Sequence, residues 1–200
     1  MKEDYYWNAF YSKDNGNNLP SSFAQEVVTK LSSEDVVIEL GCGNGRDSLF
    51  LQEVTKKYYA VDYSEEAIRR LQEKNSSSFQ AVCCDVNDLE EQNFAAPSVV
   101  YMRFFLHSID EDTQDSLFSW LYKQDNLSLF IECRSSLDQE TKKHFGSDHY
   151  RRAIDFEELK ERIRSAGYVI LDSKHSKGLA KYKEEDPYII RILAEKSKNV

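Results

Sequence analysis

Short apolar runs alternate along the chain with amphipathic stretches that carry their charges on one side. The apolar runs have the length of strands, and the stretches between them repeat apolar residues at the spacing of a helix face. We expect strands over residues 35–40, 58–62, 79–84, 98–105, 127–133, 168–171 and 188–193. We expect helices after Ser21-Ser22, over 46–56, from Ser64 onward, over 110–124 and over 156–166. This alternation predicts an α/β fold in which helices cover both faces of a mostly parallel sheet.

The size and composition suit one globular domain. The chain has 200 residues, 40% of them hydrophobic and 12% aromatic, without internal repeats or a Pro/Gly-rich linker. Its uncharged apolar stretches fall far short of the roughly 20 residues that a membrane-spanning helix needs. The first residues lack the apolar run of a secretory signal. We therefore expect one cytoplasmic domain over residues 1–200, without membrane insertion.

The four cysteines, Cys42, Cys83, Cys84 and Cys133, occur in apolar, strand-like contexts. They form neither a CxxC pair nor the Cys/His spacing of a zinc site. We expect reduced, buried thiols rather than disulfides, and no metal site.

The negative charge is concentrated in the first half of the chain. The net charge is −9; residues 1–100 hold 9 basic and 17 acidic side chains, and residues 101–200 hold 17 and 18. Residues 134–183 reverse the sign, with 12 basic and 8 acidic side chains. An acidic chain lacks the broad cationic surface that binds nucleic acid, but it can hold a local cationic pocket. The alternative is that solvated helix faces carry most of these charges.

Three of the seven glycines fall within five residues, at Gly41, Gly43 and Gly45, between an expected strand and an expected helix. Glycines at that point allow a tight turn and a close approach of the backbone to a ligand. A dinucleotide fingerprint, GxGxxG, would need glycine where Arg46 stands. The acid Glu39 before the loop suits a cationic ligand better than a pyrophosphate.

Two aspartates follow at the ends of the next two expected strands. Asp62 can accept hydrogen bonds from ribose hydroxyls, and Asp85 can accept one from the exocyclic amine of adenine. Each aspartate alone is more often a helix cap. The ordered set of a glycine loop and two acids is far more specific, because all three meet at one edge of the sheet.

At these residues the chain resembles the class I S-adenosylmethionine-dependent methyltransferases, over roughly residues 21–195. The segment 39–45 is similar to their first motif, Val61-Asp62 to the second, and Cys84-Asp85-Val86 to the third. The resemblance implies a three-layer, Rossmann-like fold with a seven-stranded, mostly parallel sheet whose last strand is antiparallel. It also implies S-adenosylmethionine as the cofactor and S-adenosylhomocysteine as its product.

Carried over position by position, the resemblance assigns roles to the cofactor site. The backbone from Gly41 to Gly45 approaches the methionine part, Glu39 orients that end, Asp62 takes the ribose, and Asp85 with Val86 takes the adenine. The full set of expected cofactor-binding residues is Trp7, Tyr11, Ser22, Glu39, Gly41, Gly43, Asn44, Arg46, Asp47, Asp62, Tyr63, Asp85 and Val86.

The segment after the fourth expected strand bears on the methyl acceptor. Base-specific amino-methyltransferases carry an Asn/Asp-Pro-Pro-aromatic motif there, whereas residues 101–107 read Tyr-Met-Arg-Phe-Phe-Leu-His, which makes nucleic-acid amines poor candidates. Arg103 and His107, four residues apart, are the expected catalytic residues. The expected acceptor-binding residues are Arg103, His107, Arg134, Tyr150, Arg151 and Lys181. Convergent Arg, His and Tyr side chains favour a small anionic acceptor, a phosphate, phosphonate or carboxylate.

A narrower resemblance links several segments to small methyltransferases of bacterial surface-polysaccharide and phosphonate pathways. The segments are 6–11, 19–23, 43–48, 103–108, 149–152 and 178–182. This resemblance implies methylation of phosphoryl or phosphonyl oxygens, or of sugars. It also implies that residues 1–31 form a helical lid over a core of residues 35–200; the alternative for that segment is a hydrophobic clasp on the sheet.

An ionised acceptor oxygen is already a nucleophile, so Arg103 and its neighbours need only hold it in line. If the acceptor is a hydroxyl instead, His107 becomes the candidate base. A sugar hydroxyl or a small amine therefore stays open as the acceptor. From a different class, a non-catalytic, cofactor-binding subunit of a polysaccharide-modifying assembly also stays open, as does the oligomeric state.

Overall fold

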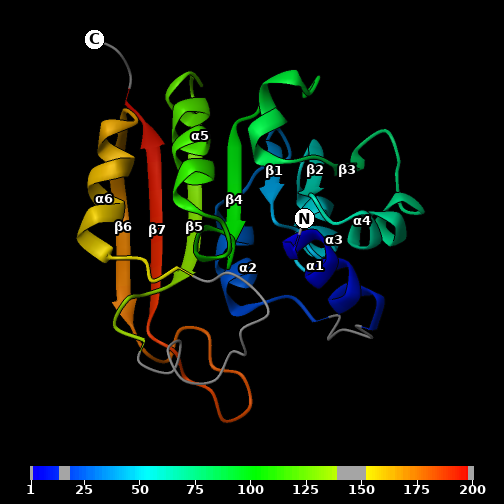
Figure 1. Ribbon diagram of the computed structural model, residues 1–200. Helices are drawn as coiled ribbons and strands as arrows, with labels where there is room; N and C mark the ends of the chain where they lie inside the picture. Colours follow the sequence, from blue (N-terminus) through cyan, green and yellow to red (C-terminus); the bar gives the residue numbers. More distant parts are fainter. Residues whose placement is uncertain (1, 14–18, 139–151, 198–200) are drawn as a thin grey trace. The chain divides into compact units, whose positions relative to one another are not determined.

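The computed structural model describes residues 2–13, 19–138 and 152–197. Its seven strands form one sheet in the order β3-β2-β1-β4-β5-β7-β6 (Figure 1). The chain divides into two compact units, Met1–Tyr101 and Met102–Val200, and β4 (Val99–Arg103) crosses the boundary.

The first unit holds three parallel strands, β1, β2 and β3, which alternate with helices along the chain. Its elements are α1 (Lys2–Lys13), α2 (Ser22–Val27), β1 (Val36–Leu40), α3 (Ser48–Leu51), β2 (Lys57–Asp62), α4 (Glu65–Gln72) and β3 (Phe79–Cys83). The strand β2 lies between the other two, with Tyr58 beside Val37 on one side and Phe79 on the other. Because β2 is buried from Tyr58 to Asp62, it reads in the sequence as a continuous apolar run.

Two helix starts in this unit confirm the capping predictions. The Ser64 side chain accepts a hydrogen bond from Ala67 N (3.3 Å) at the start of α4. Ser21 accepts one from Ala24 N (3.0 Å) at the start of α2, which continues as a 3-10 turn to Lys30. Both hydroxyls satisfy a backbone N–H that the first helical turn leaves without a partner.

The prediction of a helix over residues 46–56 is wrong in the length of the helix. The α-helix α3 has only 4 residues, followed by the 3-10 turn Gln52–Val54. Asp47 stands at its N-cap without making a capping bond, since its carboxylate accepts hydrogen bonds from Ser21 and Tyr101 instead.

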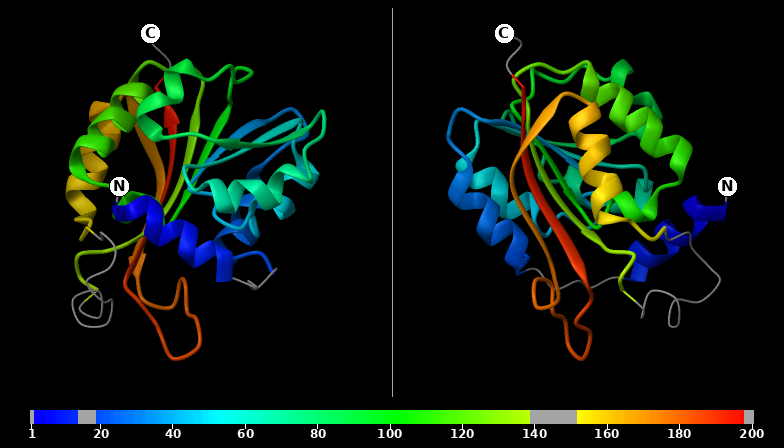
Figure 2. Two further views of the ribbon diagram at one scale, coloured as in Figure 1. Left: turned by 45° about the vertical axis from the view of Figure 1, so that its right-hand side comes forward. Right: turned by 90° about the vertical axis from the view of Figure 1, so that its left-hand side faces the viewer.

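The second unit contains the antiparallel end of the sheet. Its elements are the 3-10 turn Leu106–Ser108, α5 (Glu111–Tyr122), β5 (Ser128–Arg134), α6 (Phe156–Ser165), β6 (Tyr168–Ser176) and β7 (Ile189–Lys196). The strand β7 is inserted between β5 and β6 and runs antiparallel to both, which confirms the expected antiparallel last strand. Figures 1 and 2 show α5 and α6 side by side on one face of these strands.

The strand β6 extends well past the expected end at residue 171. It pairs with β7 up to Ser176, but residues 171–174 are exposed, and polar residues take over after Leu171. A strand at the edge of a sheet loses its apolar signal where it has no face to bury. No helix among the described residues is both long and apolar enough to cross a membrane.

The expectation of four buried thiols is wrong for one of them. All four cysteines are free, and Cys42, Cys84 and Cys133 are buried, but Cys83 is exposed. Cys83 ends β3, the strand at the other edge of the sheet. Burial raises the pKa of the Cys84 thiol to about 11, so this thiol is unreactive near neutral pH.

Candidate functional site

The glycine loop follows β1 and is built from backbone conformations that favour glycine. Gly41, Gly43 and Gly45 have φ angles of 74°, 53° and 76°. The N–H of Gly41 donates to Val61 O at the end of β2 (2.9 Å), which ties the loop to the neighbouring strand. A Cβ added at Gly43 would lie 2.5 Å from the Tyr11 hydroxyl, so no side chain fits there without displacing that ring.

Asp62, at the end of β2, holds this loop and the next helix together. Its carboxylate accepts hydrogen bonds from Gly43 N (2.9 Å) and Ser64 N (2.9 Å). The residue is only 7% exposed, and burial raises the pKa of its carboxyl group above the ordinary value, against the effect of these backbone hydrogen bonds. Each carboxylate oxygen has further lone pairs, so this structural role leaves room to accept a ribose hydroxyl.

Glu39 lies in β1, two residues before the loop, and is buried. Its Oε2 accepts a hydrogen bond from Tyr58 Oη (3.0 Å) and another from Ser48 Oγ. Burial, followed by the nearby Glu39 charge, raises the pKa of Tyr58 well above its ordinary value. The carboxylate is thus held in one orientation by two neutral donors.

The expected adenine residues lie just after β3. Asp85 is exposed and accepts hydrogen bonds from the backbone N–H and the side-chain amide of Asn87, both at 2.8 Å. Val86 is half-buried beside it, and Tyr63, also half-buried, follows Asp62 at the end of β2. The exposed Asp85 is therefore accessible to a ligand while it caps the 3-10 turn Val86–Glu91.

Asp47 and its neighbours form a buried polar cluster. Asp47 accepts hydrogen bonds from Ser21 N and Ser21 Oγ, both at 2.7 Å, and from Tyr101 Oη at 2.9 Å. Arg46 Nε is 3.7 Å from Asp47 Oδ1 and, within the described part of the chain, has no hydrogen-bond partner. The predicted Ser22 is exposed; its neighbour Ser21 is the serine that the cluster uses. Asn44, half-buried, accepts a 3.4 Å hydrogen bond from Arg46 N.

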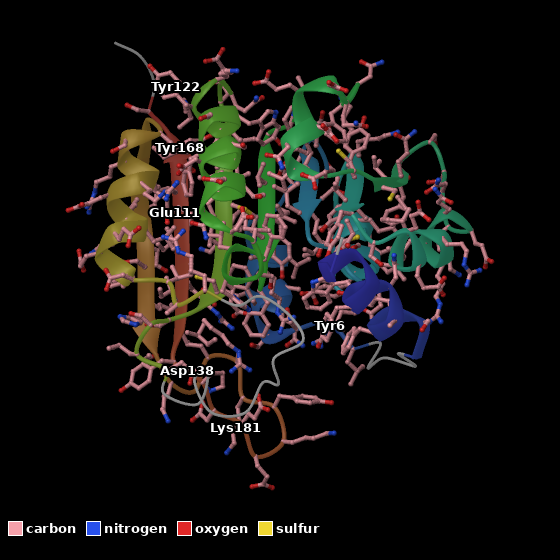
Figure 3. All side chains as sticks on the ribbon, in the orientation of Figure 1. Tyr6, Glu111, Tyr122, Asp138, Tyr168 and Lys181 are labelled. Atoms are coloured by element: carbon pink, nitrogen blue, oxygen red, sulfur yellow. The ribbon has the colours of Figure 1, made fainter. Side chains whose placement is uncertain are left out.

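The helix α1 packs against the glycine loop and α4. Trp7 stacks on Tyr11 with ring centroids 5.9 Å apart, and Figure 3 labels Tyr6 on the same helix. Asn8 Oδ1 accepts hydrogen bonds from Ser64 Oγ (2.6 Å) and Glu66 N (3.2 Å) at the start of α4. Nothing in the local sequence pointed to Asn8, because an asparagine in an amphipathic helix is usually solvated.

In the second unit, three of the predicted acceptor-site residues gather around Phe104. The Arg103 guanidinium lies 4.3 Å and that of Arg134 6.0 Å from the Phe104 ring centroid. The His107 ring meets Phe104 edge to face at 5.5 Å. Buried His107 also accepts a hydrogen bond at Nδ1 from Arg134 N (3.3 Å).

Carboxylates balance much of the positive charge in this cluster. Buried Glu132 accepts from Arg103 Nε at 3.0 Å and from Arg191 Nε at 2.6 Å. Arg134 pairs with Asp138 at 3.1 Å and with Glu185 at 2.9 Å. The excess of cations counted over residues 134–183 is therefore not concentrated at Arg134.

The other predicted acceptor residues are not brought into this cluster by the contacts described. Lys181 is exposed on the connection between β6 and β7, where Figure 3 labels it. Tyr150 and Arg151 lie outside the described residues.

Residues 37–124 match the model of a family described as a methyltransferase domain. The matched segment includes the glycine loop, Asp62, Asp85, Arg103 and His107. No curated protein matches the chain.

Solved structures of methyltransferases share the fold of the chain. An S-adenosylmethionine-dependent methyltransferase from Clostridium acetobutylicum is 16% identical, with a TM-score of 0.68 over 88% of this chain and 92% of that one. One from Methanosarcina mazei is 16% identical, with a TM-score of 0.69 over 86% and 96%. The 1,6-didemethyltoxoflavin-N1-methyltransferase of Burkholderia thailandensis, solved with S-adenosylhomocysteine, is 17% identical, with a TM-score of 0.67 over 88% and 77%. These likenesses and the strand order establish a Rossmann-like methyltransferase fold. With the matched domain, they support a class I S-adenosylmethionine-dependent enzyme.

The residues around the glycine loop fit S-adenosylmethionine. The three glycines have positive φ angles, so the backbone turns tightly after β1 without side chains on the turn. Asp62 has acceptor capacity left for a ribose, and the buried Arg46 Nε has a hydrogen to donate to an anionic end. The assignment of single residues to parts of the cofactor stays a prediction.

Three residues of the second-unit cluster, Glu132, Arg191 and Phe104, were not predicted from the sequence. Glu132 and Arg191 each interrupt an otherwise apolar strand, which was a usable signal, and they face each other in the β5–β7 register. Phe104 carried no signal, because an aromatic residue after a strand is ordinary and its backbone conformation is not visible in sequence.

Proposed function

We propose that this protein transfers a methyl group from S-adenosylmethionine to an oxygen of a small anionic acceptor, a phosphate, phosphonate or carboxylate. The methyltransferase domain supports methyl transfer and this cofactor. The residues around the glycine loop would bind the cofactor, and Arg103 would bind the acceptor. The resemblance of several segments to small methyltransferases of polysaccharide and phosphonate pathways favours a phosphonate as the first acceptor to test.

The proposed chemistry asks the protein mainly for alignment and exclusion of water. When bound, S-adenosylmethionine supplies an electrophilic methyl group, which passes to the acceptor oxygen while the electron pair of the broken bond stays on sulfur. An ionised oxygen carries no proton that must be removed. No general base is then needed.

The hydrogen bond to His107 is the observation that carries the proposal. Since Arg134 N donates to His107 Nδ1, the neutral ring holds its hydrogen on Nε2. Nε2 is then a donor, and the lone pair on Nδ1 faces a buried backbone N–H. A ring in this state is badly placed to take a proton from a hydroxyl, which favours an acceptor that arrives already ionised.

Arg103 offers the positive charge for such an acceptor. Its guanidinium and that of Arg191 both donate to the one carboxylate of Glu132. The Arg103 side chain is 20% exposed, against 8% for Arg191 and 1% for Glu132. Arg103 is therefore the more accessible of the two guanidinium groups, and such a group can bind two oxygens of an oxyanion side by side.

The test compares His107→Asn with His107→Ala, using methyl-labelled cofactor with methylphosphonate and benzoate as acceptors. Asparagine can still accept the hydrogen bond from Arg134 N but cannot act as a base, whereas alanine does neither. We expect His107→Asn to retain most of the wild-type kcat and to leave the shape of the pH–rate profile unchanged. We expect His107→Ala to lower the rate, because it leaves a buried N–H without an acceptor.

A base role for His107 predicts a different result. Both variants would then lose activity equally, together with any rise in wild-type rate near the usual histidine pKa of about 6.5. The Burkholderia thailandensis neighbour is an N1-methyltransferase. Transfer to amines or sugar hydroxyls but to neither anion would contradict the proposal, and bound cofactor without any turnover would favour a binding subunit.

A further inference from the structure

Phe104 has a backbone conformation that a bulky residue rarely adopts. Its φ angle is 55°, directly after β4, and its N–H donates to Glu132 O (2.7 Å). Within residues 2–13, 19–138 and 152–197, two other non-glycine residues share a positive φ and have ordinary reasons for it. Asn126 is of a type that tolerates this region, and Lys183 lies in the tight turn between Tyr182 and Glu185. Glycine would fit position 104 without strain, so the phenylalanine ring must contribute something that offsets the strain.

The ring of Phe104 contacts the groups that the proposed function relies on. The guanidinium of Arg103 lies over it at 4.3 Å, the distance of a cation–π contact. Arg134 lies near it at 6.0 Å, and the His107 ring packs against it at 5.5 Å. Phe104 is half-buried, as is Arg103.

Arg103 is thereby held by two contacts of different direction. Glu132 accepts from Nε at 3.0 Å, and the central carbon of the guanidinium lies over the Phe104 ring, 4.3 Å from its centroid. The hydrogen bond fixes the Nε end of the group, and the ring restricts how the rest of the group can move. A guanidinium group has a higher affinity for two oxygens of an anion when its plane is already oriented before the anion binds.

We propose that Phe104 is a positioning residue, which orients the Arg103 guanidinium for an acceptor that presents two oxygens to it. This inference rests on the proposed function, since it needs Arg103 to bind the acceptor. The strained backbone places the ring under the guanidinium, and the contacts with Arg103, Arg134 and His107 hold it there.

The experiment measures KM and kcat for methylphosphonate and benzoate in Phe104→Leu, Phe104→Tyr and Arg103→Gln. Leucine keeps the apolar bulk but has no π face, so we expect an increase of about tenfold in KM for both anions. Tyrosine keeps the π face and should recover most of this loss. The KM for S-adenosylmethionine should stay unchanged in all three variants, a split that a general loss of folding would not produce.

Two further variants separate positioning from structure. Phe104→Gly removes the ring and the backbone strain together, so we expect a weaker acceptor affinity without a matching loss of melting temperature. Asn126→Gly is the matched control, because it relaxes an exposed positive-φ residue in another loop; it should leave both KM values as in the wild type. In a double-mutant cycle, Phe104→Leu should add nothing to Arg103→Gln.

The outcomes of these measurements test the positioning role of Phe104 separately from the proposed function on which it rests. If Arg103→Gln raises the acceptor KM but the Phe104 variants do not, or if their effects add fully, the positioning role is refuted and the anionic acceptor stands. If Arg103→Gln leaves the acceptor KM unchanged, or if the wild type methylates neither anion, the proposed function fails and this inference fails with it.

Discussion

The two units of the chain treat a buried carboxylate in opposite ways. In the first unit, Asp62 accepts hydrogen bonds from two backbone N–H groups, which are neutral donors. In the second, Glu132 is held between two guanidinium groups, those of Arg103 and Arg191. Both acids are nearly inaccessible to solvent, at 7% and 1% exposed. Neutral donors orient a carboxylate and leave its charge in place, whereas guanidinium groups orient the carboxylate and also neutralise its charge.

This difference affects what the charge counts of the sequence mean in each unit. The first hundred residues are net −8, from 9 basic and 17 acidic side chains, and Asp62 accepts hydrogen bonds from backbone N–H groups, which leave the charge of a carboxylate in place. A carboxylate beside the glycine loop would suit a cationic sulfonium cofactor. In the second unit Arg134 is balanced by Asp138 and Glu185, so the surplus of cations in the sequence is not a cationic surface at that residue.

The largest effect should come from removing the acid that two arginines share. Glu132→Ala leaves Arg103 and Arg191 without their common carboxylate, and uncompensated buried charge typically costs about 3–5 kcal/mol of unfolding free energy. Urea unfolding monitored by circular dichroism measures this loss. The matched control is Glu185→Ala, which removes a carboxylate that is 48% exposed and should cost less than about 1 kcal/mol. Equal losses in the two variants would contradict the special role of the buried trio.

A smaller effect should follow in the first unit from Asp62→Asn. The amide has one acceptor oxygen, so one of the two N–H groups of Gly43 and Ser64 loses its partner, at a cost of about 1–3 kcal/mol. Because the loop also loosens, we expect the affinity for S-adenosylhomocysteine to fall at least about tenfold by calorimetry. Asp85→Asn is the control: this exposed residue should change the unfolding free energy by less than about 0.5 kcal/mol. If both variants bind the product like the wild type, neither acid serves the cofactor.

Most of the fold was predictable because the central strands are buried on both faces. The expected strand over 35–40 corresponds to β1 (Val36–Leu40), and the run over 58–62 lies within β2 (Lys57–Asp62). The predictions failed where an element is exposed or where helical geometry changes. The edge strand β6 continues through polar residues, and α3 gives way to the 3-10 turn Gln52–Val54 after 4 residues.

The candidate site was predictable in its residue types but not in its partners. A glycine pentad with acids at the next two strand ends is a specific pattern, so the loop, Asp62 and Asp85 could be named from sequence. The pairing of Glu132 with Arg191 depends on β7 lying antiparallel beside β5, which places two residues 59 positions apart opposite each other. No local pattern contains that register, nor the positive φ of Phe104.

The smallest predicted effect is a pH dependence in the second unit, and its sign differs from that expected for Asp62. His175 hydrogen-bonds to Ser135 Oγ at 2.7 Å, and its pKa is lowered from 6.5, chiefly by burial and despite the nearby Asp155 and Glu157. The unfolded chain therefore binds this proton more tightly than the folded one, so the stability that His175 contributes is complete above about pH 6.5 and is lost as the pH falls through the lower folded-state pKa. For Asp62, whose pKa is raised by burial, the folded chain binds the proton more tightly. The contribution of Asp62 to the stability of the fold therefore decreases as the pH rises from 3.8.

Urea midpoints between pH 5 and pH 8 should fall more steeply towards acid in the wild type than in His175→Phe, which keeps a ring but does not titrate. Parallel slopes in the two proteins would show that the histidine is protonated equally in the folded and unfolded chains, and the contrast between the two groups would then rest on Asp62 alone.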